Sequence, residues 1–128
     1  MNTALTAKVQ ASFDEAVART REALAEQGFG VLTEIDVKAT MKAKIGEDFR
    51  PYTILGACNP AMAHKALQME DKVGAMLPCN VVVQELAPGR CEVAAVDPVA
   101  SMQAIDNDAL KKVAAEVAAR LKTVVESV

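Results

Sequence analysis

The sequence is poor in aromatic residues and has no tryptophan: aromatics make up 3% of its 128 residues. Proteins that hold single-stranded nucleic acid stack bases on aromatic rings, and proteins that hold duplex DNA need an excess of positive charge. Here the net charge is −3. The only local group of lysines, Lys38, Lys42 and Lys44, is explained by the exposed face of a helix. We therefore expect no nucleic-acid partner.

Long apolar runs are also missing, and no leader is expected. No stretch approaches the ~18 uninterrupted apolar residues that cross a bilayer, and the first eight residues lack the basic and apolar parts of a secretory signal. The three cysteines are far apart and odd in number, so they do not form a disulfide framework. We expect no membrane partner and a reducing, cytoplasmic setting.

The chain contains enough apolar residues to form the core of one folded domain. Hydrophobic residues make up 52% of the sequence and charged residues 24%, which is ordinary for a folded chain with a polar surface. A chain of this length buries roughly two thirds of the surface that it exposes when unfolded. We expect a single domain over residues 1–128.

Apolar residues recur with the period of a strand in some segments and of a helix in others. The patterns predict strands near residues 5–9, 29–37, 52–58, 79–86 and 91–96, and helices near residues 13–27, 38–44, 60–70, 98–103 and 108–127. The later strands are too closely connected for parallel crossovers throughout. We therefore expect an α+β fold: a curved antiparallel sheet with the first and last helices packed on one face, and short inner helices inserted between strands.

Two Cys-Asn pairs, Cys58-Asn59 and Cys79-Asn80, stand at the ends of predicted strands, and the only histidine, His64, follows the first pair closely. We expect the two pairs to meet at one margin of the sheet. Thiolate and imidazole suit soft metals, so Cys58, Cys79 and His64 are candidate ligands for zinc or Cu(I). The usual close spacing of two cysteines is absent.

Two other interpretations stay open for the same residues. Cys58 precedes a predicted helix start, where peptide dipoles stabilise a thiolate, so it is a candidate redox or nucleophilic thiol. Free cysteines are also commonly small buried apolar residues with no chemistry, and Cys91 fits that description. Glu34 and Asp36 are two apart on a predicted strand, which places both on one face, opposite Phe29, Val31 and Ile35. Two carboxylates on one face could serve acid–base or metal chemistry, but the alternation of a half-buried strand favours a solvent-exposed pair.

Several segments together resemble the domain-of-unknown-function family 302. They are Phe29–Val37, Ala39–Lys42, Gly46–Tyr52, Ile54–Pro60 and Leu77–Val83, and the resemblance covers nearly the whole chain from about Ala4. It implies a β-α-β4-α arrangement like that of TATA-binding-protein folds, commonly as a homodimer. It does not imply DNA binding, because one fold hosts many functions. It supplies no catalytic residues.

The leading hypothesis is a protein that binds a small ligand or a soft metal. The candidate contacts lie around the two Cys-Asn turns: Cys58, Asn59, His64, Cys79 and Asn80. The alternatives are a thiol-based redox protein or enzyme that uses Cys58, and a homodimeric interaction module. The sequence does not decide whether the protein is an enzyme.

Overall fold

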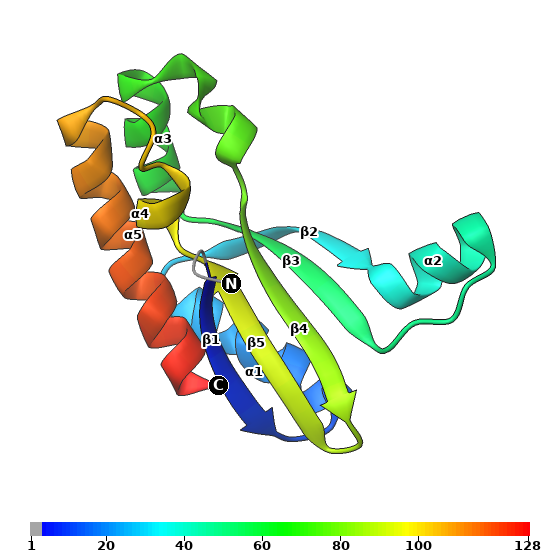
Figure 1. The fold of residues 1–128 in the computed structure, drawn as a ribbon. Coiled ribbons are helices and arrows are strands. Elements are labelled where there is room, and N and C mark those ends of the chain that lie inside the picture. The colour runs from blue at the N-terminus through cyan, green and yellow to red at the C-terminus, as the bar shows by residue number, and fades with distance from the viewer. Residues whose placement is uncertain (1–3) are drawn as a thin grey trace.

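The computed structural model describes residues 4–128, and its elements follow the predicted order (Figure 1). The strands are β1 (Ala4–Gln10), β2 (Gly30–Asp36), β3 (Tyr52–Cys58), β4 (Cys79–Ala87) and β5 (Arg90–Val96). The helices are α1 (Phe13–Glu26), α2 (Val37–Ile45), α3 (Pro60–Met69), α4 (Pro98–Ser101) and α5 (Asp108–Ser127). The segment Asp71–Met76, expected as a loop, forms a 3-10 helix, η1.

The five strands form one antiparallel sheet in the order β1-β5-β4-β3-β2. The first strand pairs with the last along its whole length, from Ala4 opposite Val96 to Gln10 opposite Arg90. The tight hairpin between β4 and β5 turns at Gly89, whose φ of 74° is costly for other residues. β1 and β2 are therefore the two edges, and β4 lies at the centre.

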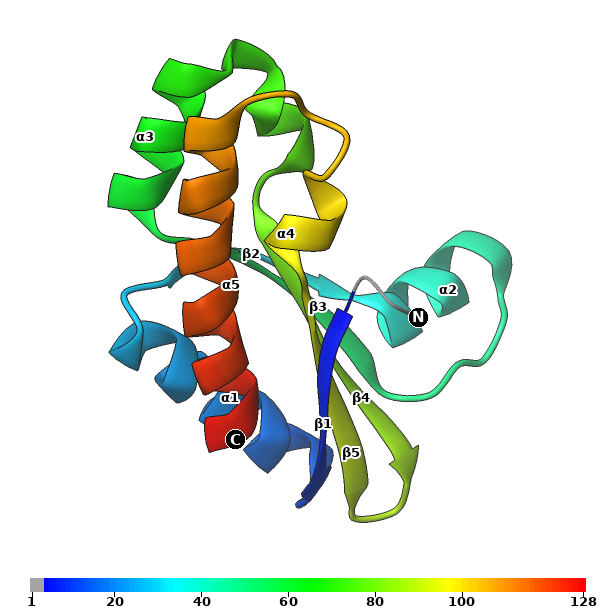
Figure 2. The ribbon, with the colours of Figure 1, turned by 60° about the vertical axis from the view of Figure 1, so that its left-hand side comes forward.

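Helices α1 and α5 cover one face of the sheet, as predicted, and the core lies between them and the strands (Figure 2). Leu24 of α1, Leu121 of α5 and Leu55 of β3 are fully buried there. Each such side chain contributes about 1.5–3 kcal/mol before the entropy of folding is counted. The opposite face of the sheet carries no helix layer, and we call it the open face.

Local signals set the helix ends where the sequence placed them. The Ser12 hydroxyl accepts a hydrogen bond from the backbone N–H of Glu15 at 3.2 Å, which caps α1. The helix is followed by Gly28, whose φ of 82° suits only glycine. Asp36 caps α2 in the same way, because its carboxylate accepts from the N–H of Ala39 at 2.9 Å.

Strand β2 departs from the regular alternation that the sequence suggested. Its register slips between Val31 and Thr33, so that Val31 lies opposite Ala57 and Thr33 lies opposite Gly56. After this bulge Thr33 and Ile35 share the open face, and Glu34 takes the helix side. The prediction that Val31 and Ile35 share one face, with Glu34 on the other, was wrong.

A glycine explains the position of this bulge. A Cβ added to Gly56 would collide with the Thr33 hydroxyl and the Pro78 ring. The Thr33 and Pro78 side chains therefore pack directly against the backbone of Gly56. Glu34 then reaches α1, where its carboxylate accepts a hydrogen bond from Arg21 Nη2 at 2.8 Å. Neither Glu34 nor Asp36 is left as a free carboxylate, because Asp36 caps α2.

A smaller cluster of buried residues joins α3, η1 and α4 to the first half of α5. It consists of Ala66, Val73, Met102, Leu110 and Ala114. The cluster holds the upper helices of Figure 1 together beyond the end of the sheet. Within residues 4–128, no helix is long and apolar enough to cross a membrane.

Candidate functional site

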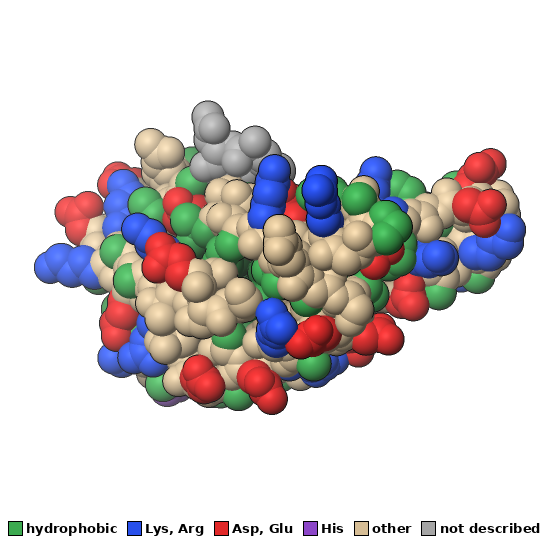
Figure 3. All heavy atoms as spheres, turned by 90° about the horizontal axis from the view of Figure 1, so that it is seen from below, with side chains coloured by type: hydrophobic (Ala, Val, Ile, Leu, Met, Phe, Trp, Pro, Cys, Tyr) green, Lys and Arg blue, Asp and Glu red, His purple; other side chains and the backbone are tan. Residues whose placement is uncertain are grey.

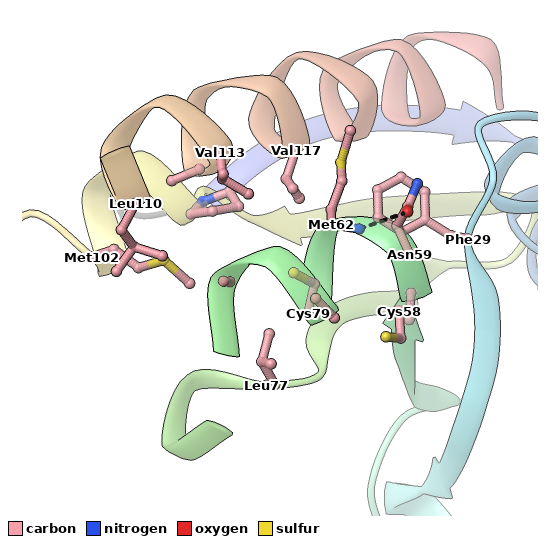
Figure 4. Close-up of a pocket in the computed structure, with 15 residues that line it drawn as sticks. Phe29, Cys58, Asn59, Met62, Leu77, Cys79, Met102, Leu110, Val113 and Val117 are labelled. Carbon is pink, nitrogen blue, oxygen red and sulfur yellow. Dashed lines mark hydrogen bonds between the residues drawn. The ribbon is translucent and has the colours of Figure 1, made fainter. Parts of the chain in front are cut away.

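Two hollows are candidate sites, and they lie on opposite sides of the sheet. The first, the apolar cavity, lies between α3, α5 and the end of the sheet (Figure 4). Its lining residues include Phe29, Cys58, Asn59, Met62, Leu77, Cys79, Met102, Leu110, Val113 and Val117. Its volume is only about 30 Å³, which is room for about one water molecule.

The structure brings the two Cys-Asn turns together, as expected. Cys58 ends β3 and Cys79 begins β4, and Ala57 lies directly opposite Cys79 in the sheet. Both residues belong to the lining of the apolar cavity (Figure 4). Residues separated by 21 positions in the chain therefore share one wall.

Burial makes the Cys79 thiol a poor nucleophile. Its loss of contact with water, and to a smaller extent the neighbouring Cys58, raise its pKa to about 11. A thiol with that pKa is almost entirely protonated at neutral pH, whereas the thiolate is the reactive form. Cys91 is also buried, which raises its pKa, and its thiol lies 3.4 Å from the carbonyl oxygen of Ala11. As predicted for Cys91, its environment is structural.

Asn59 serves the fold at this point. Its side-chain oxygen accepts a hydrogen bond from the backbone N–H of Met62 at 3.2 Å, shown by the dashed line in Figure 4. The bond caps the start of α3, and Pro60 takes the first helical position. The side-chain oxygen is thus already engaged.

His64 does not join the two cysteines. The buried side of α3 is formed by Met62 and Ala66, and His64, midway between them in the sequence, is exposed and does not line the cavity. Two residues along a helix correspond to about 200° of rotation, which places a side chain on the opposite face. Residues 4–128 contain no cluster of three His, Cys, Asp or Glu side chains that could hold a metal. The expected ligand set of Cys58, Cys79 and His64 is therefore not assembled.

The second hollow, the open-face groove, runs over the uncovered face of the sheet and has a volume of about 720 Å³. Its lining residues are Ala4, Thr6, Tyr52, Met76, Pro78, Asn80, Val82, Gln84, Glu92, Ala94, Ala95, Val96 and Ser101. Asn80 is the only predicted site residue among them. Asn80 faces this groove whereas its neighbour Cys79 faces the apolar cavity, because successive residues of a strand point to opposite faces of the sheet.

The floor of the groove is apolar, and polar groups stand around it. Val82 lies opposite Ala94 in the sheet, at the middle of β4 and β5. Next to this pair, the Gln84 amide donates a hydrogen bond to the Glu92 carboxylate at 3.3 Å. Glu92 is the only charged side chain in the lining.

Comparisons with known proteins agree on the family. The model of the family described as "Domain of unknown function DUF302" matches residues 5–128. The chain belongs to the DUF302 family. The structure of this DUF302 chain is similar to the crystal structure of an uncharacterized conserved DUF302 protein from Bacillus stearothermophilus. The TM-score is 0.91 at 29% identity, over 99% of this chain and 98% of that one. No curated protein matches the sequence.

Sequence reasoning missed the open-face groove of this DUF302 chain, although one signal for it was present. The alternation in β4 and β5 already separated Val82, Gln84, Glu92 and Ala94 from the residues of the core face. The sequence does not show that this second face stays uncovered by helices. That depends on where the inner helices pack, which is a property of the whole fold.

Proposed function

We propose that this DUF302 protein is a binding protein that holds a small, largely apolar ligand in the open-face groove. The observation that carries the proposal is the volume of about 720 Å³ over an apolar floor, since small-molecule sites commonly measure about 300–1,000 Å³. The apolar cavity, at about 30 Å³, is too small for such a ligand. We therefore assign Cys58 and Cys79 to the packing of the fold, and Asn80 to the ligand.

The lining suggests the chemical class of the ligand. An apolar body would lie on Val82 and Ala94, and a polar end would bond to the side chain of Asn80. The Gln84 amide is engaged at both ends, by Arg50 and by Glu92. Glu92 is the only charged side chain in the lining. Lys8 lies opposite it in the sheet, and Arg50 donates to Gln84 at 3.5 Å, so the charges near the groove favour neither an anionic nor a cationic end.

One observation favours the alternative of thiol chemistry, the position of Cys58 directly before the capped start of α3, and two observations weigh against it. The raised pKa of Cys79 keeps that thiol protonated, and His64 lies outside the cavity that holds Cys58. A reactive thiol is activated by a neighbouring base or cation or by a helix start, and at Cys58 the start of α3 would act without the histidine.

Titration with N-phenyl-1-naphthylamine, a neutral apolar fluorescent probe, tests the proposal. The natural protein is expected to give a saturable rise in fluorescence. Ala94→Trp fills the middle of the groove and should weaken binding at least about tenfold, which is about 1.4 kcal/mol. Val82→Trp, from the opposite strand, should have the same effect.

The matched control is Ala109→Trp, which adds the same side chain at an exposed position of α5 outside the groove. It should leave probe binding unchanged. Far-UV circular dichroism checks that each variant is folded. A probe that does not bind, or that binds Ala94→Trp and Val82→Trp as tightly as the natural protein, would remove the groove as the ligand site.

A further inference from the structure

A row of polar side chains crosses the open face at one end of the groove. Gln84 of β4 lies opposite Tyr52 of β3 and opposite Glu92 of β5, and Glu92 in turn lies opposite Lys8 of β1. Because cross-strand partners point to the same face of a sheet, these four side chains stand side by side, and we call them the polar row. Figure 3 shows the molecule from this end, where acidic and basic side chains lie next to each other.

The polar row offers a hydrogen-bonding site for a ligand. The Gln84 amide donates to the Glu92 carboxylate at 3.3 Å and accepts from Arg50 at 3.5 Å. A carboxylate has about four positions at which it can accept a hydrogen bond, so Glu92 can accept another from a ligand. Because charges of both signs meet here, a hydroxyl, which is neutral and both donates and accepts, suits the row better than an ion.

The groove changes from polar to apolar and back to polar along β4. Val82, two residues before Gln84 on the same face, lies opposite Ala94 and forms the apolar floor. Asn80, two residues earlier again, is exposed and lines the same groove. At about 3.3 Å per residue, the four steps from Asn80 to Gln84 span roughly 13 Å. One continuous groove thus has a polar group at each end and an apolar middle.

We propose that the ligand of the open-face groove is an elongated molecule with a hydroxyl group at each end and an apolar middle. The inference rests on the proposed function, because it names the ligand class of the same groove. One end bonds to Asn80, the middle lies on the apolar floor, and the other end bonds to Glu92. A ligand with a single polar end would lay apolar atoms against one of these two side chains, and so remove its water without replacing the lost hydrogen bond.

Displacement of bound N-phenyl-1-naphthylamine by two alcohols of equal chain length tests the proposal. Octanol has one terminal hydroxyl, and octanediol has a hydroxyl at each end. A groove that is merely apolar favours octanol, because the second hydroxyl of octanediol loses water for nothing. In the natural protein we expect octanediol to displace the probe at an about two- to tenfold lower concentration than octanol, since each of its hydroxyls gains a hydrogen bond. Butanediol, which is too short to reach both ends, should have no such advantage over butanol.

Two variants remove the polar ends one at a time. Asn80→Leu and Glu92→Leu keep the apolar floor, so both should still bind the apolar probe, but octanol should now displace it at least as well as octanediol. Gln68→Leu is the matched control, because it replaces an exposed side-chain amide on α3 outside the groove. It should keep the preference for octanediol. Circular dichroism should show all three variants folded, since none of the substituted residues is buried.

The outcomes separate this proposal from the proposed function. A natural protein that binds the probe but releases it more readily to octanol than to octanediol overturns the two-ended ligand and leaves the groove as the ligand site. A preference for octanediol that survives both Asn80→Leu and Glu92→Leu shows that the second hydroxyl is held elsewhere, and it overturns the proposal too. A natural protein that does not bind the probe overturns both proposals.

Discussion

Gly56 is the position where a single added methyl group tests the least regular part of the sheet. The alanine Cβ would enter the space that the Thr33 side chain and the Pro78 ring now occupy. Pro78 Cγ would lie 2.8 Å from it, so at least one neighbour must move. Overpacking of this kind costs about 1–3 kcal/mol. We expect Gly56→Ala to lose about 2 kcal/mol of stability, despite the small gain that alanine brings by restricting the unfolded chain.

The test is a double-mutant cycle with Thr33→Ala. If Thr33 faces Gly56 across the bulge, removing its side chain relieves part of the collision. The double variant should then be more stable than the sum of the two single changes predicts, by roughly 0.5–2 kcal/mol. Urea unfolding followed by circular dichroism at one fixed protein concentration measures all four proteins, since association would shift apparent stability.

Gly74→Ala is the control, because the nearest atom to its added Cβ would be Leu67 Cδ2 at an ordinary 3.8 Å. It should be neutral or slightly stabilising. Regular alternation along β2 would put Thr33 on the helix side, away from Gly56. A Gly56→Ala variant as stable as the natural protein, or a cycle with no coupling, would therefore refute the bulge and the packing described here.

Two further predictions concern the core and the buried thiol. Leu121→Ala removes a fully buried side chain and should cost about 3–5 kcal/mol in urea unfolding. Leu67→Ala, at an exposed site, should change stability by less than about 0.5 kcal/mol, and equal losses would contradict the assignment of the core. Because the pKa of Cys79 is raised from its ordinary 9.0 to about 11, its folded thiol keeps its proton where the unfolded thiol loses it. The resulting stability is fully present below pH 9 and declines as the pH rises towards 11. Cys79→Ala should make that alkaline decline shallower, and iodoacetamide should modify Cys79 far more slowly at pH 8 than it modifies the unfolded chain. Fast modification of Cys79 in the folded protein would show that the thiol is not buried.

Much of the fold could be predicted from local signals. The side chains of Ser12, Asp36 and Asn59 accept hydrogen bonds from unpaired backbone N–H groups at the starts of α1, α2 and α3. Each bond joins residues three apart, so the cap can be recognised from the local sequence. The period of α5 and the turn around Gly89 are equally local. These features were enough to predict the antiparallel sheet and the side on which the first and last helices pack.

The candidate site was predicted in part. The meeting of Cys58 with Cys79 followed from their places at the ends of strands, and the two strands are neighbours in the sheet. The position of His64 did not follow, because its orientation depends on which face of α3 packs against the body, and that face is set by Met62 and Ala66. The role of Asn80 changed for a similar reason, since it lies on the face of the sheet that no helix covers.

The sequence by itself determined the order of the strands and main helices, because helix caps and turns rest on contacts within a few residues and strands show in the alternation of apolar residues. Only the tertiary structure decided which surfaces remain free. The bulge opposite Gly56 and the uncovered face with its groove both arise from residues that are distant in the chain. Whether a residue is buried depends on the packing of all the helices and strands. An exposed surface can therefore be identified only from the complete tertiary structure.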